Sequence, residues 1–131
     1  MDINNEEITS SKEYQEFLKN NSGKGTLNIR VSSASQALPI INLKVIVSKV
    51  IGKYDVIFYE GYSDSSGIIP PIILPTPKLN KNDLEVPKGI SYSIRATYKP
   101  DNINETFKVE MYENISVIQN INISLNNLEE L

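Results

Sequence analysis

The sequence predicts an all-β fold, a seven-stranded antiparallel β-sandwich preceded by a short amino-terminal helix. Several short segments alternate apolar and polar residues, most cleanly in residues 90–98, where Ser91, Ser93 and Arg95 separate apolar or aromatic neighbours. Glycine, proline and asparagine turns separate these segments, and no helical period occurs between them. Such alternation is typical of antiparallel strands with one solvated face. Two sheets of that kind cover each other's apolar faces, and a β-region of about a hundred residues suits seven strands.

A short helix is expected over residues 9–23, before the alternating segments begin. Ser10 and Glu13 have capping-box spacing, and Tyr14 and Phe17 start an apolar stripe at helical spacing. The asparagines and the glycine that follow end the helix. We expect this stripe to pack against the protein's own core rather than to dock a partner, because most amphipathic stripes complete a core.

The predicted strands follow in order, and the alternation assigns an inner face to most of them. It places Leu43, Ile94 and Val109 in the shared core, and the same phase assigns Tyr92 and Tyr98 to packing. The third strand is ambiguous, because its apolar residues fall on both faces. The predicted strands are residues 26–32, 42–49, 53–60, 68–74, 90–98, 106–112 and 115–125.

Residues 62–77, YSDSSGIIPPIILPTP, join a polar turn to an apolar run that carries four prolines. Asp64 and Gly67 predict the turn, because aspartate bonds its own backbone two residues on and glycine tolerates positive φ. Proline has no amide hydrogen, so residues 68–74 are expected to form an edge strand that resists pairing with another chain. A long polar crossover over residues 76–89 follows.

Length and charge limit the classes of protein. The 131 residues suit one domain, with a tail and helix at 1–24, a sandwich at 25–126 and a tail at 127–131. A net charge of −3 and a pI near 5.0 argue against nucleic-acid binding. The acidic start lacks the apolar region of a signal peptide, and no apolar run reaches the length of a membrane span, so we expect a soluble chain.

The chain contains neither cysteine nor histidine. Disulfides, ordinary zinc sites and Ser-His or Cys-His nucleophile pairs are therefore excluded. Carboxylates are paired at Asp83 with Glu85 and at Asp101 with Glu105, but loop carboxylates are most often simply solvated. Asp64 supplies one carboxylate, far short of the oxygen ligands that calcium takes. We therefore predict no catalytic residue, no metal, no cofactor and no enzyme activity, with a carboxylate-only glycan hydrolase as the enzymatic alternative.

Tyrosine is the main aromatic residue, and three of the seven tyrosines flank the turn before the proline-rich run. Exposed tyrosines stack on sugar rings or anchor protein partners, because they join apolar area to a hydroxyl. Loops gather at the ends of a sandwich, which makes 61–67, 76–89 and 99–104 the predicted contact regions. The predicted binding residues are Tyr54, Tyr59, Tyr62 and Asp64.

The order of several landmarks resembles a known family. The landmarks are GTLNIRVSS at 25–33, the turn at 63–67 before the proline-flanked run, YSIRATY at 92–98 and ISVIQNINISL at 115–125. Across residues 25–125 this order resembles carboxypeptidase-regulatory-like domains, which implies a prealbumin-like (transthyretin-like) variant of the immunoglobulin-like sandwich. The likeness extends to the amino-terminal domain of clostridial spore cortex-lytic enzyme precursors. Hydroxyisourate hydrolases of this fold rely on histidines, which this chain lacks.

The resemblance implies a setting more than an activity, because one fold serves many functions. That setting is the cell wall, the spore or a phage particle, and the abundance of Ile, Asn and Lys with little Arg fits the AT-rich genome of a Firmicute. We therefore expect a non-catalytic interaction or structural module with a protein or cell-wall glycan partner and with self-association through strand edges. The alternative binding function is a carbohydrate or peptidoglycan module that uses the tyrosines near Gly61.

Overall fold

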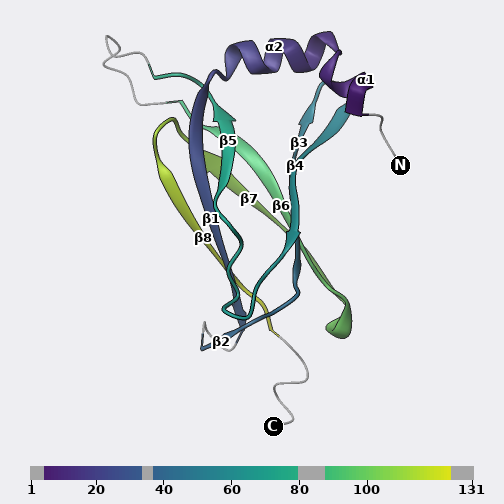
Figure 1. Cartoon of the computed structure of the whole chain (residues 1–131), viewed down its shortest axis with the longest axis vertical. Helices are drawn as coiled ribbons and strands as arrows, with labels where there is room; N and C mark the ends of the chain where they lie inside the picture. The colour runs from purple at the N-terminus through teal and green to yellow at the C-terminus, as the bar shows by residue number, and fades with distance from the viewer. Residues whose placement is uncertain (1–4, 34–36, 80–87, 125–131) are drawn as a thin grey trace.

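Two β-sheets pack face to face in the computed structural model, with two short helices near one end of them (Figure 1). The structure describes residues 5–33, 37–79 and 88–124. The elements in chain order are α1 (Asn5–Thr9), α2 (Lys12–Asn20), β1 (Gly23–Ser33), β2 (Leu38–Pro39), β3 (Lys44–Ile51), β4 (Tyr54–Tyr62), β5 (Ile72–Thr76), β6 (Ile90–Tyr98), a 3-10 turn η1 (Lys99–Asp101), β7 (Ile103–Met111) and β8 (Ser116–Asn122).

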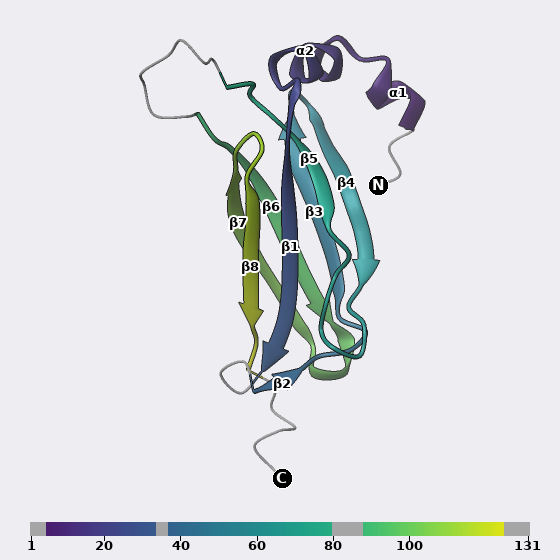
Figure 2. The same cartoon turned by 60° about the vertical axis from the view of Figure 1, so that its left-hand side comes forward.

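The two sheets differ in width. Sheet A contains β1, β2, β5 and β8, and β1 is its central strand. Leu27 pairs with both β5 and β8, and Ser32 pairs with both β2 and β8, so β2 and β5 share one side of β1. Sheet B is antiparallel in the order β4-β3-β6-β7. Three strands of sheet A therefore lie abreast and face the four strands of sheet B, and β7 passes behind β8 in Figure 2.

The predicted core phases are confirmed. Leu43 and Ile94 are fully buried, and Val109 is only 6% exposed. Tyr92 is buried as predicted, and its hydroxyl donates a hydrogen bond across the sandwich to the Pro75 carbonyl oxygen of β5. Burial, with a smaller effect of Tyr14, raises the pKa of Tyr92, because the phenolate would lose its hydration. The all-β sandwich with a short amino-terminal helix is the observed fold class.

Two details of the predicted sandwich differ from the structure. The described residues form eight strands, because Leu38 and Pro39 pair briefly with the end of β1. One pairing is parallel, since β8 runs alongside β1 from Thr26↔Ser116 to Ser32↔Asn122. Alternation reports which face a side chain takes but not the direction of the neighbouring strand, so the sequence pattern could not reveal this pairing.

The amino-terminal segment forms two helices instead of one over residues 9–23. The N-cap of α2 is Ser11 and not Ser10, because the Ser11 hydroxyl accepts the Tyr14 backbone N–H. Ser10 instead bonds back to the Glu6 carbonyl oxygen at the end of α1. Phe17 is buried against Phe58 of β4, with ring centroids 5.9 Å apart, so α2 packs on its own sandwich as expected. Among the described residues, no helix is long and apolar enough to cross a membrane.

The proline-rich run forms an edge strand that is shorter than predicted. Strand β5 pairs only with β1 among the described residues, and it spans Ile72–Thr76 rather than residues 68–74. Pro70 and Pro71 explain the late start, because they cannot donate to the ladder, and only an isolated bridge joins Ile68 to β1.

Candidate functional site

The outer face of sheet A carries a groove of about 290 Å³. Strand β1 supplies its floor, the segment before β5 supplies one wall, and β8 supplies the other; Figure 2 shows these three segments side by side on the near face. Asn28 fixes the β1–β8 side, because its amide donates to the Ser116 hydroxyl at 2.8 Å. The lining residues are Asn28, Ile29, Arg30, Ile68, Ile69, Pro71, Ser116 and Ile118.

Two aliphatic side chains at the groove, Ile118 and Ile68, are exposed. Ile118 is 63% exposed and Ile68 is 39% exposed. Ile118 pairs with Asn28 of β1, and it occupies a position whose neighbours along β8, Ser116 and Asn120, are polar and exposed. Exposed aliphatics that gather around a hollow favour contact with another molecule.

The charge of this face is opposite to that of the whole chain. The outward residues of β1, β5 and β8 include two cations, Lys24 and Arg30, and no acid, although the chain has a net charge of −3. Within the described part of the chain, Arg30 makes no ion pair. The Asp64 carboxylate accepts the backbone N–H groups of Ser66 and Ile68. The groove therefore offers an unpaired guanidinium between aliphatic walls.

Lysines on β3 have partners, in contrast to Arg30. Lys44 lies 3.9 Å from the Glu60 carboxylate. Lys49 donates to the Ser91 carbonyl oxygen at 2.8 Å and lies over the Tyr92 ring. Desolvation, followed by repulsion from Lys108, lowers the pKa of Lys49. These lysines serve the sandwich itself, which leaves Arg30 as the better candidate for recognition.

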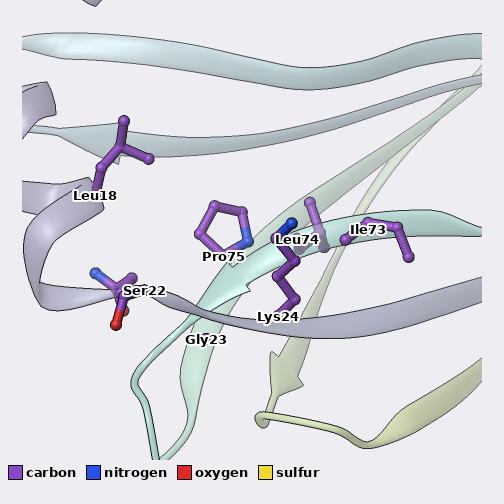
Figure 3. Close-up of a pocket in the computed structure, with 8 residues that line it drawn as sticks. Leu18, Ser22, Gly23, Lys24, Ile73, Leu74 and Pro75 are labelled. Atoms are coloured by element: carbon purple, nitrogen blue, oxygen red, sulfur yellow. The ribbon is translucent and has the colours of Figure 1, made fainter.

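A second hollow of about 300 Å³ lies where the end of α2 meets β5. Figure 3 shows Leu18 on the helix, Ile73, Leu74 and Pro75 on β5, and the Lys24 side chain beside them. The hollow is mostly apolar, and its lining contains one charged side chain. It can accept an aliphatic group but offers little to fix the orientation of a ligand.

The predicted binding residues differ in exposure. Tyr54 is buried, with Lys53 over its ring, and Tyr59 is half-buried with its hydroxyl against Gly61. Tyr62 is 59% exposed, and Asp64 is engaged in the turn described above. These tyrosines lie on β4 of sheet B, so they do not join the groove on sheet A.

Sequence reasoning missed the residues that line the groove. One signal was available, because Ile118 falls out of phase among the polar residues of its strand. Of the proposed carboxylate pairs, Asp83 and Glu85 lie outside the described residues, as does part of the loop at 76–89. Asp101 ends η1 and Glu105 lies on β7. The described residues contain no cluster of three or more acids that could hold a metal ion.

The fold and the groove together define a prealbumin-like β-sandwich with a surface site. No protein-family model and no curated protein matches the sequence. Among solved structures, the TIE protein of Bacillus anthracis matches with a TM-score of 0.55 and 13% identity, covering 79% of this chain. (S)-Allantoin synthase matches with a TM-score of 0.50 and 10% identity over 80% of this chain. A 5-hydroxyisourate hydrolase of Klebsiella pneumoniae matches with a TM-score of 0.48 and 10% identity over 77% of this chain.

The likenesses to the TIE protein and to the allantoin synthase show the fold alone. The chain spans 17% of the TIE protein, 42% of the allantoin synthase and 91% of the hydrolase. None of the three is a spore cortex-lytic enzyme, so that part of the resemblance stays a prediction.

The prediction that this protein is not an enzyme is wrong as an inference from its sequence and fold. (S)-Allantoin synthase is an enzyme, and a similar sandwich is found within it. The absence of histidine and cysteine excludes particular mechanisms, but it does not exclude catalysis on this fold. Enzymatic function is therefore a class to be tested for this chain.

Proposed function

We propose that this protein is an interaction module that binds a polypeptide partner through the groove on the outer face of sheet A. One observation supports this proposal most strongly: Arg30 is unpaired among the described residues and lies between Ile68, Pro71 and Ile118. Arginine is favoured at interfaces because its planar guanidinium binds a carboxylate through two parallel hydrogen bonds. The neighbouring aliphatics supply apolar area that a partner can bury.

The groove chemistry indicates what the partner carries. A carboxylate would pair with Arg30, and an adjacent aliphatic side chain would lie against Ile118. We therefore infer a partner segment in which an acidic residue neighbours Val, Ile or Leu. The setting implied by the sequence resemblance, a cell wall, spore or phage particle, is part of this proposal.

The experiment is selection from a displayed library of random linear peptides, compared between variants. The wild-type protein is expected to enrich peptides with an acidic residue beside an aliphatic one. Arg30→Glu should weaken binding of those peptides by about tenfold or more, because it replaces attraction with repulsion. Arg95→Glu is the matched control, since Arg95 is also exposed on a strand but lies on sheet B.

The control decides between a local contact and a general effect of charge. Equal losses in Arg30→Glu and Arg95→Glu, or enrichment of peptides without acids, would contradict the proposal.

A glycan partner remains the second candidate, because the Tyr62 ring is largely exposed. Sedimentation with purified peptidoglycan separates the two functions. If Tyr62→Ala abolishes sedimentation and Arg30→Glu leaves it unchanged, the partner is a glycan. That result would overturn the proposal that the groove is the binding site.

A further inference from the structure

We propose that the open edge of β8 binds one additional β-strand, supplied by another polypeptide. The contact would be made by backbone groups at the edge of sheet A, so it is distinct from the groove on the outer face and does not depend on the groove's partner. The inference comes from the backbone register of β8, the lack of protection on its edge and an uncovered part of β7.

The register shows which backbone groups of β8 are available. The Thr26 N–H donates to the Ile115 oxygen at 3.0 Å, and the Ile123 N–H donates to the Ser32 oxygen at 2.8 Å. Alternate residues of a strand bond to the same neighbour, so Val117, Gln119 and Ile121 direct their backbone groups toward β1. Four residues direct theirs to the open edge, namely Ser116, Ile118, Asn120 and Asn122.

Edge strands usually carry features that prevent further pairing, and β8 lacks them. Charged side chains, prolines and bulges are the common features. Within the described residues, β5 has prolines, β4 has Asp55 and Glu60, and β7 has Glu105, Lys108 and Glu110. The sequence of β8, SVIQNIN, has no charge and no proline, and its register with β1 runs without a shift over all seven residues. It is therefore the least protected edge of the described structure.

The inner face of β7 is incompletely covered. Glu105 pairs with Ala96 and so shares its face, yet Ala96 is fully buried and Glu105 is exposed. Ile103 and Phe107, on the same face of β7, are only partly buried, as is Val117 of β8. Sheet A therefore covers this part of β7 incompletely. A strand added to β8 would be a fourth strand abreast in sheet A and would extend its cover toward Ile103, Glu105 and Phe107.

The charges favour a single strand over a second copy of the sandwich. Strand β8 carries no charged side chain, so a second copy that paired through its own β8 edge would bring no cation to Glu105. The strand should place aliphatic side chains at alternate positions against Ile103 and Phe107. Between them it should place a lysine, because Glu105 makes no ion pair within the described part of the chain.

The probe is the peptide Ser-Val-Thr-Lys-Thr-Val-Ser, titrated against the full chain and followed by amide chemical shifts. Binding is expected to shift the amides of Ser116, Ile118, Asn120 and Asn122. Peptide Ser-Val-Val-Thr-Thr-Lys-Ser has the same composition without the alternation, and it should bind about tenfold more weakly or not at all. A version that is N-methylated at alternate residues, on the edge that would face β8, should also fail, because it cannot donate to β8.

Asn120→Pro tests the protein side, since it removes an edge N–H without removing a bond to β1. Asn120→Pro should weaken binding of the alternating peptide by about tenfold or more. Asn120→Thr, which keeps the N–H, should bind that peptide with the wild-type affinity. Arg30→Glu should also bind normally, which separates this edge from the groove. Equal binding of the alternating, shuffled and methylated peptides would overturn the proposal, as would amide shifts at Arg30, Ile68 and Ile69 of the groove without shifts at Asn120 and Asn122. The methylated peptide tests the backbone contact even if Asn120→Pro does not fold.

Discussion

Replacing Ile94 with alanine should lower the free energy of unfolding by about 2–5 kcal/mol, the largest effect expected in this protein. Ile94 is fully buried in the middle of β6, where it pairs with Val47 on one side and Phe107 on the other. The substitution removes three carbon atoms from the core between the sheets, and rigid strands on both sides limit how far the cavity can collapse. Urea unfolding followed by circular dichroism measures the loss.

Ser93→Ala is the matched control for Ile94→Ala. Ser93 is the preceding residue on β6, and its side chain points away from the core, so its loss should cost about 0.5 kcal/mol or less. Similar losses in the two variants would mean that Ile94 does not lie between two packed sheets.

Replacing Gly67 with alanine should cost about 2–3 kcal/mol, because two effects add at this turn. Gly67 has a φ of +73°, which is unfavourable for a residue with a Cβ atom. An added Cβ would also overlap the Val31 carbonyl oxygen of β1, which is backbone and cannot move aside alone. Thermal unfolding measures the cost, and binding at the groove should weaken as well, because Ile68 follows the turn directly.

Gly52→Ala is the comparison for Gly67→Ala. Gly52 also has a positive φ, of +60°, and an added Cβ would meet the Cγ and Cβ atoms of Glu13, which belong to a side chain and not to the backbone. The backbone effect of about 1–2 kcal/mol should therefore appear together with the cost of shifting Glu13. If Gly52→Ala is as destabilising as Gly67→Ala, the contact with Val31 costs no more than the contact with Glu13.

The sequence could predict most of the fold because alternation reports burial directly. The phase of the alternation assigns Leu43, Ile94 and Tyr92 to the core, and all three are buried. Proline cannot donate a hydrogen bond to a β-ladder. The prolines around Ile72 therefore predict an edge strand, and they also make that strand shorter than predicted.

The candidate site could not be predicted in the same way, because it depends on how distant segments are placed together. The groove joins β1, the segment before β5 and β8, and only the parallel pairing brings Ile118 beside Asn28. The prediction that the tyrosines bind a partner was based on residue type alone, and Tyr54 is buried in the structure. The error about enzyme activity has a similar origin, because the absence of histidine excludes one family's mechanism and not all chemistry.

Amide hydrogen exchange along β8 tests most directly whether sheet A has three strands abreast, with no strand of the described residues on the outer edge of β8. The backbone amides of Val117, Gln119 and Ile121 donate to β1, whereas those of Ile118 and Asn120 do not. The first set should therefore exchange at least about a hundredfold more slowly than the second. Equal protection of both sets would contradict the account, since it would mean that another segment already covers β8.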